Sequence, residues 1–397
     1  MAGFKENIAA LGVTIQPTPG VYNEPGQADL LPISAPDDGS DAITGDDPTL
    51  TGSIFAAPRQ FLGRRGRAGA TAILRGPGGT APPGAAAWPL ARILLGAGFT
   101  ELINPTAITG TAAAGGTTSS IVMAAGSSAI DDFYNGMPIQ HANIGGAGTI
   151  RGTSLIRDYD GATRRATLME TLATAIATGG YIIPPSLTYV LSTGAQIPLL
   201  SCKVWRHKKA RKYRDCAISS FALNIPVSND QNTDLPSIEF AMVGVPVPAT
   251  DETTPLISTS QLLPPPPAKA GKFAFAGLKL GHQTMRLEFA LETGAPPNQN
   301  FDAGQEGYEI MSGTRTVNLD LNEQLMASLD LDSLVDTQAS VPLLSGWGQN
   351  VGNRFLAGVP NMFLDPFNPA PRNGFVGVSG TASPSDVDRS VALSVIY

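Results

Sequence analysis

The hydrophobic residues of this chain recur mostly in short alternating runs, separated by segments rich in Gly and Pro. Alternation places one side of a strand in a core and the other toward solvent. Repeated short strands with turns between them are typical of sandwiches and barrels. The pattern therefore predicts a mainly β fold. The strands expected in its second half cover residues 187–191, 238–243, 272–276, 285–292, 314–321 and 390–397.

One segment has helical spacing instead. After an expected strand at residues 70–74 and a Pro/Gly-rich stretch, apolar residues fall on one face of a helix that starts after Trp88. Pro89 fits a first helical turn, and Gly98 supplies a left-handed stop. We expect a single helix over 89–97 that covers a sheet. Its apolar face is made by Leu90, Ile93, Leu94 and Ala97.

Residues 107–183 differ in texture from the rest of the chain. Short strand patterns alternate there with Asn-Gly and Asp-Gly turn signals. We interpret this segment as a small all-β module on the exterior of a main domain formed by 1–106 and 184–397, because insertions are tolerated at loops whose ends lie close together. The acids in its turns lack the spacing of a calcium loop, so we assign them to turn formation. They are Asp131, Asp132, Asp158 and Asp160.

Composition supports a β-rich chain with long loops. The 397 residues include 44 Gly and 33 Pro, and only 15% are charged, which disfavours a doubly wound enzyme. We expect a short helix at 323–329 and surface loops or a C-terminal arm over 336–388. No apolar run approaches the roughly 18 residues of a membrane span, so we expect no membrane association. Cys202 and Cys216 are expected to be buried small residues rather than a redox pair.

Charge is distributed unevenly along a chain of net charge −7. The first 62 residues form an acidic segment that we expect to be an extended arm, followed by a basic loop, and a second basic cluster is expected at a hairpin formed by 197–205 and 213–225. Acidic arms and basic loops suit head-to-tail contacts between copies. The alternative is a solvated tail. The candidate contact residues are Asp37, Asp38, Asp46, Asp47, Arg64, Arg65, Arg67, Arg206, Lys208, Lys209, Arg211 and Lys212.

The sequence contains no pattern of a catalytic or cofactor site. The three histidines lie on separate segments without neighbouring ligands at metal-binding spacing. No nucleophile elbow, phosphate loop or dinucleotide fingerprint is present. We expect no enzymatic activity, cofactor or metal. Few aromatic residues accompany the basic hairpin, which disfavours specific nucleic-acid binding.

These segments together resemble one known family. The arginine-rich approach to a strand, the LRG turn at 74–76 and the Trp-containing helix with its LGAGF end resemble the N-terminal part of tail tube proteins of long-tailed bacteriophages. The runs DCAISSFALNI at 215–225 and SIEFAMVGV at 237–245 are similar to central strands of that family. Phrases within 107–183 resemble a small β-module that recurs among phage structural proteins.

The resemblance implies a tail-tube-like β-sandwich or barrel with one flanking helix, an inserted β-module and extended arms. It further implies a structural virion protein of a long-tailed, non-contractile phage, assembled in the bacterial cytoplasm. Hexameric rings, or trimeric rings of larger subunits, would stack around a channel through which DNA passes transiently. Tape measure and terminator proteins would be partners. The basic hairpin is expected to lie outside the channel, because free cations would retain DNA. A capsid decoration protein or a receptor-binding tail fibre is the alternative.

Overall fold

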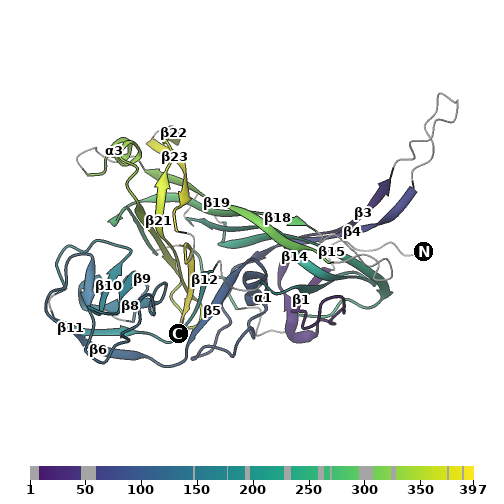
Figure 1. Cartoon of the computed structure of the whole chain (residues 1–397), viewed down its shortest axis with the longest axis horizontal. Helices are drawn as coiled ribbons and strands as arrows, with labels where there is room; N and C mark the ends of the chain where they lie inside the picture. The colour runs from purple at the N-terminus through teal and green to yellow at the C-terminus, as the bar shows by residue number, and fades with distance from the viewer. Residues whose placement is uncertain are drawn as a thin grey trace.

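A computed structural model shows the predicted mainly β architecture (Figure 1). It describes residues 9–45, 60–145, 148–176, 178–192, 197–227, 234–257, 263–268, 271–294, 307–322, 328–372, 375–386 and 389–397. Nearly all strand pairing is antiparallel. Among these residues one large branched sheet and one smaller sheet account for the strands.

The large sheet contains a run of eight long antiparallel strands, which we call the long sheet. Its two outermost strands, β3 and β22, each pair on one side only within the described chain. In spatial order the strands are β3 (Ile33–Gly45), β4 (Gln60–Ile73), β15 (Ser237–Asp251), β14 (Lys209–Pro226), β18 (His282–Gly294), β19 (Glu309–Asn322), β23 (Phe375–Pro384) and β22 (Asn368–Arg372).

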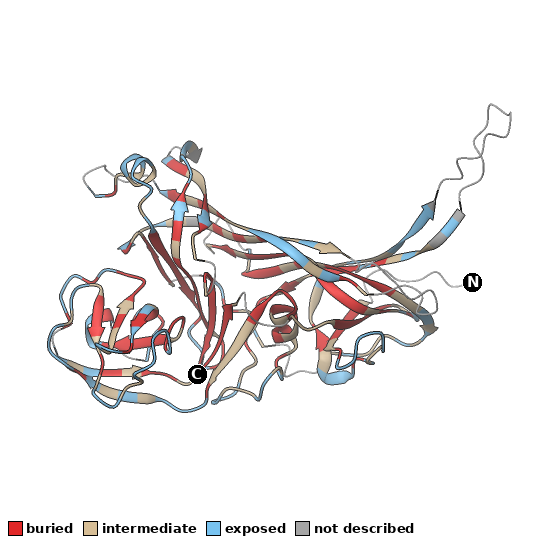
Figure 2. Ribbon diagram, in the orientation of Figure 1, coloured by how far each residue is buried: buried red, intermediate tan, exposed pale blue. Residues whose placement is uncertain are grey.

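A second group of strands packs against one face of the long sheet. Phe99 of this group contacts Phe221 and Phe289 of the long sheet, with ring centroids 5.8 and 5.7 Å apart. The group consists of β5 (Phe99–Asn104), β12 (Ser186–Leu191), β24 (Ala392–Ile396), β21 (Arg354–Leu364), β20 (Val341–Trp347), β16 (Lys272–Phe275) and β17 (Leu278–Lys279). The two layers form a sandwich with a shared core, seen as the red interior in Figure 2. No barrel closes among the described pairings.

The predicted helix is confirmed as α1 (Pro89–Gly96). All residues of its predicted apolar face are buried, and Gly98 has a φ of +95° as the left-handed stop requires. It packs beside β5 and β1 (Ala9–Ile15); β1 pairs with β13 (Leu200–Arg206) and with β2 (Leu30–Leu31). The unpredicted helices are α2 (Ala142–Gly145), α3 (Leu331–Asp336) and the 3₁₀ helix η1 (Gln27–Asp29). Most of the predicted helix at 323–329 lies outside the described residues.

Three sequence-based predictions are wrong. The acidic segment is not an unpaired arm, because residues 33–45 form strand β3 on β4. The arginines at 64, 65 and 67 lie on β4, not on a loop, because this strand begins at Gln60 rather than at residue 70. Residues 336–388 are not mainly loops, because they contribute four strands. In each case pairing with a distant strand outweighs an unfavourable local composition.

Residues 108–183 form the smaller sheet, with a core of their own around Tyr159 and Tyr181. Its order is β6 (Ile108–Ala112), β11 (Gly179–Ile183), β8 (Pro138–His141), β9 (Thr153–Asp160), β10 (Arg165–Leu168) and β7 (Ser120–Val122). We call this unit the module. The strands that flank it, β5 and β12, pair with each other, so its two ends leave the main body side by side.

Candidate assembly surfaces

The acidic strand and the basic hairpin lie against each other within one chain. The Asp38 carboxylate accepts hydrogen bonds from Arg206 and Arg211, and only 1% of its side chain is exposed. Arg206 also donates to the Pro36 carbonyl. A nearly buried carboxylate shared by two guanidinium groups holds β3 firmly on the hairpin of β13 and β14.

A second charge cluster lies beside it. Lys203 pairs with Glu24 and, at 2.6 Å, with Glu252, while Lys212 lies 3.3 and 3.5 Å from the same two carboxylates. Hydrogen bonds from Lys203, and then from Thr250, lower the pKa of Glu252 to about 2. Burial acts to lower the pKa of Lys203, but its hydrogen bonds to the two glutamates outweigh burial and raise it. The lowered pKa of Glu252 and the raised pKa of Lys203 therefore keep this pair charged over a wide pH range.

The predicted contact residues divide into paired and unpaired sets. Arg67 pairs with Asp41 at 3.4 Å, in addition to the pairs above. Arg64 lies over the Phe61 ring and Arg65 over the Tyr308 ring. Exposed residues with no ion pair in the described part of the chain are Asp37, Arg64, Lys208 and Lys209. Asp46 and Asp47 lie outside the described residues.

Sequence analysis missed Glu252, and its candidate list left out Glu24 and Asp41, although both belong to the acidic segment that it identified. Glu252 follows the end of β15, where it comes beside the basic hairpin because β14 and β15 pair over their full length. No local signal places Glu252 near the hairpin, because its position follows from the register of β14 with β15.

An open groove lies between the hairpin of β3 and β4 and the hairpin of β14 and β15. We call it the basic groove; its volume is about 820 Å³. Phe61, Tyr213 and the prolines of β15 supply apolar surface, and Asp38 is its single acid. The cations that line it are Arg64, Lys209, Arg211 and Lys212.

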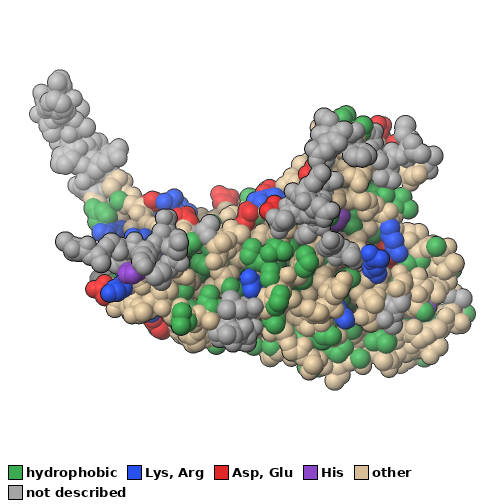
Figure 3. All heavy atoms as spheres, turned by 180° about the vertical axis from the view of Figure 1, so that it is seen from behind, with side chains coloured by type: hydrophobic (Ala, Val, Ile, Leu, Met, Phe, Trp, Pro, Cys, Tyr) green, Lys and Arg blue, Asp and Glu red, His purple; other side chains and the backbone are tan. Residues whose placement is uncertain are grey.

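The face of the long sheet away from the core forms a different surface, which we call the outer face. Core residues such as Phe221, Leu287 and Leu319 point inward, so their neighbours point outward. Arg286 is held by Glu239 at 2.9 Å and by Glu288. Viewed from behind, Lys, Arg, Asp and Glu side chains gather along the upper side of the molecule (Figure 3). The outward residues on β14, β15, β18 and β19 include Ser220, Ala222, Asn224, Glu239, Ala241, Arg286, Glu288, Ala290, Asn318 and Asp320.

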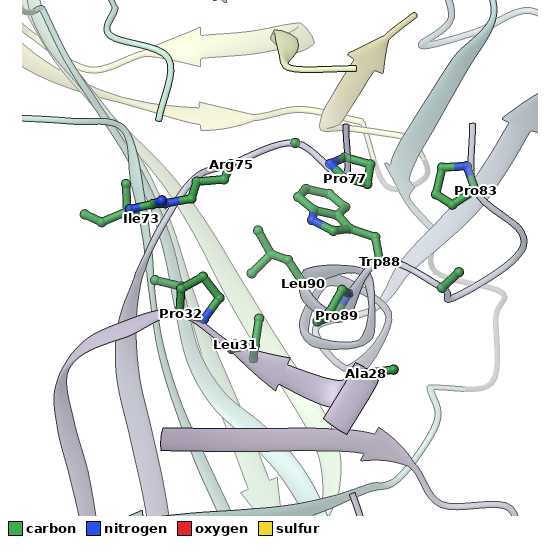
Figure 4. Close-up of a pocket in the computed structure, with 13 residues that line it drawn as sticks. Ala28, Leu31, Pro32, Ile73, Arg75, Pro77, Pro83, Trp88, Pro89 and Leu90 are labelled. Atoms are coloured by element: carbon green, nitrogen blue, oxygen red, sulfur yellow. The ribbon is translucent and has the colours of Figure 1, made fainter. Parts of the chain in front are cut away.

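A smaller apolar pocket of about 290 Å³ opens at the start of α1 (Figure 4). Trp88, Leu90 and Leu31 line it, and Arg75 lies at its side, where it donates a 2.8 Å hydrogen bond to the Leu263 carbonyl. The lining includes no carboxylate, thiol or imidazole. The pocket therefore offers shape but no acid, base or nucleophile for catalysis.

The remaining polar candidates have structural roles. Asp160 accepts backbone hydrogen bonds from Ala162 and Thr163, and Asp131 accepts one from Gly161, which confirms their role in turns. The assignment is wrong for Asp158, which lies within strand β9 opposite Thr167. Burial raises the pKa of both cysteine thiols, so they stay protonated and unreactive. Within the described ranges, no cluster of three potential metal ligands occurs. No described helix has the length and apolar character needed to cross a bilayer.

Comparison of the sequence with models of known protein families finds no match, and none of the curated proteins is significantly similar to it. The geometry of the chain is therefore the basis for a functional assignment.

Proposed function

We propose that this chain is a structural subunit of a phage tail tube, whose copies form rings that stack around a channel for DNA. The proposal rests on the edges and the outer face of the long sheet. Within the described chain this sheet ends in two strands that pair with another strand on one side only, and its outer face carries small and polar residues with more acidic than basic charges.

Unpaired edges favour pairing with other copies. An exposed strand edge presents unsatisfied backbone groups and invites another strand. The two edges, β3 and β22, lie at opposite ends of the long sheet (Figure 1). Contact between unlike ends of successive copies is heterologous, and it closes into a ring when the rotation per copy allows.

The outer face suits a channel through which DNA must slide. Where β14, β15, β18 and β19 lie side by side, the outward charged residues are Glu239, Arg286, Glu288, Glu292 and Asp320, and the arginine is already paired with Glu239 and Glu288. This described part of the face offers DNA no free cation. It would gain little affinity from counterion release, so the phosphates would pass without being held.

The basic hairpin, by contrast, has most of its charge satisfied by the chain itself. Asp38, Glu24 and Glu252 hold four of its cations. This supports a position outside the channel. The proposal assigns a structural rather than catalytic role in the virion, with other copies, the tape measure and the terminator protein as partners.

The test is electron microscopy and sedimentation of the purified full chain over a range of concentrations. Rings or tubes with an axial channel are the expected result. Isolated monomers at high concentration would contradict the proposal, and compact trimers without a channel would instead favour a decoration or fibre protein.

A further inference from the structure

The basic groove lies at the β3 end of the long sheet. Strand β4 pairs with β15 only as far as Gly66 opposite Gly244. Beyond that point β15 continues along β14, and β4 continues with β3 alone. The two hairpins therefore diverge, and the groove is the space between them, open to solvent and to a neighbouring molecule.

Two cations in the described lining of the groove have no ion pair within the chain. Arg211 is committed to Asp38, and Lys212 to the two glutamates of its cluster. Arg64 and Lys209 line the same groove, are exposed, and have no ion pair in the described chain. Exposed Phe61, 61% accessible, adds apolar contact area beside Arg64. An acidic and partly apolar occupant would complement this lining.

The opposite end of the long sheet supplies such an occupant. Figure 1 shows α3 beside β22, far from the groove. Asp332 and Asp336 are exposed on this helix, and neither has a basic partner among the residues that the structure describes. Leu334 and Val335, between them, are half-buried against the main core, so the exposed side of the helix is polar and acidic.

We propose that the basic groove of one copy receives the acidic surface of α3 from a second copy. This inference rests on the proposed ring, in which the β3 end of each subunit meets the β22 end of the next. It identifies the charges that select this contact: Arg64 and Lys209 on one side, Asp332 and Asp336 on the other.

A second copy fits the groove better than DNA does. Among the described residues that line the groove, only Arg64 and Lys209 are cations without an ion pair, and Asp38 lies in the same lining. Nucleic-acid affinity depends on many phosphate contacts. Two short-range ion pairs instead suit recognition between proteins, where complementary charge sets orientation and excludes wrong partners.

The test uses charge reversal in the full-length chain. A groove variant carries Arg64→Glu and Lys209→Glu, and a helix variant carries Asp332→Lys and Asp336→Lys. Each variant alone places like charges at the contact, and we expect the concentration needed for assembly to rise about tenfold or more. An equimolar mixture of the two restores opposite charges at every contact and should assemble as the unchanged chain does. Restoration by mixing excludes misfolding as the cause.

The matched control is Asp158→Lys, a reversal of an exposed acid on the module outside both surfaces, which should leave assembly unchanged. Carbodiimide coupling followed by mass spectrometry should join Lys209 to Asp332 or Asp336 between copies. If the unchanged chain assembles and both reversal variants assemble equally well, the groove contact is wrong while the tube proposal stands. If the groove variant assembles normally but loses binding to duplex DNA, the groove serves nucleic acid instead. If the unchanged chain never assembles, the tube proposal fails first.

Discussion

At the scale of single residues, the hairpin surface is held by acids that each serve two cations. Asp38 bridges two arginines, and Glu252 contacts two lysines. Removing one acid therefore weakens the charge compensation of two cations. For Glu252, one of these is the nearly buried Lys203, whose side chain is 4% exposed. The effect of such a change should depend on pH.

The substitution Glu252→Gln tests this dependence. The folded-state pKa of Glu252 is lowered to about 2 from a usual 4.5, so its contribution to stability is present above pH 4.5 and is lost as the pH falls from 4.5 toward 2. We expect the variant to unfold at a lower temperature than the unchanged chain at pH 7, and the difference to shrink between pH 4.5 and pH 2.5. Thermal unfolding followed by circular dichroism measures it. Asp158→Asn, an exposed acid elsewhere, should show little difference at any pH, and a constant deficit for Glu252→Gln would contradict the ion-pair explanation.

Close backbone approach imposes a second residue-scale constraint. A Cβ at Gly76 would lie 1.9 Å from the Gly352 carbonyl oxygen, whereas a Cβ at Gly84, in the same loop, has nothing within 4 Å. We expect Gly76→Ala to cost about 1–3 kcal/mol of unfolding free energy because the backbone must move. Gly84→Ala should be neutral within about 0.5 kcal/mol. Chemical denaturation compares the two, and equal costs would refute the predicted contact.

At the scale of elements, the module is fixed to the main body by a buried ion pair and an apolar interface. Lys272 on β16 pairs with Glu170 and donates to the Thr153 carbonyl at 2.9 Å; the two side chains are 2% and 0% exposed. Ile150, Leu155 and Met169 of the module pack against apolar residues of β12, β16, β20, β21 and β24. The module is therefore docked, not tethered.

Substitution of the lysine tests the docking. Lys272→Met leaves the buried Glu170 with only the exposed Lys279 at 3.9 Å, and we expect a loss of about 3–5 kcal/mol. The double variant Lys272→Met with Glu170→Leu should recover most of that loss, because neither charge remains. Lys279→Met is the control, since Lys279 is exposed and 3.9 Å from Glu170; its cost should stay below about 1 kcal/mol. A Lys272→Met variant as stable as the control would show that the pair is not buried in solution.

Sequence patterns predicted those elements that are determined by residues within the same short segment. Residues 285–292 alternate regularly and lie within β18, and Pro89 with Gly98 bounded α1. Strand β3 could not be predicted, because Asp, Gly, Ser and Pro disfavour strands and its partner is a separate segment beginning at Gln60. For the surfaces, the sequence located the charges but not their partners. That Asp38 faces Arg206, 168 positions away, follows only from the pairing of distant strands.

At the scale of the whole molecule, the long sheet separates two kinds of surface. Its inner face carries the shared core, α1 and the second layer, and its outer face is free of them (Figure 2). Under the proposed function, that outer face meets DNA. The lack of unpaired cations where the described strands β14, β15, β18 and β19 lie side by side, rather than any specific contact, is then the property that matters.

Adding cations to the outer face should therefore retain DNA. Ala290 and Thr314 are exposed and lie opposite each other on β18 and β19. We expect tubes carrying Ala290→Arg and Thr314→Arg to co-sediment with short duplex DNA at low salt and to release it as salt rises. Tubes carrying Ala290→Ser serve as the control and should not bind. If the arginine tubes form normally and bind no more DNA than the control, the outer face does not line the channel.

The pairing of β5 with β12 has an evolutionary consequence. Since these two neighbouring strands carry the entry and exit of the module, a genome could exchange the whole cassette for a foreign one while the strand register around the splice points stays intact. The exchange is constrained in one respect, however. Loss of the module would expose Val190, Leu344 and Leu356 to solvent, so a replacement domain must bring apolar residues that cover them.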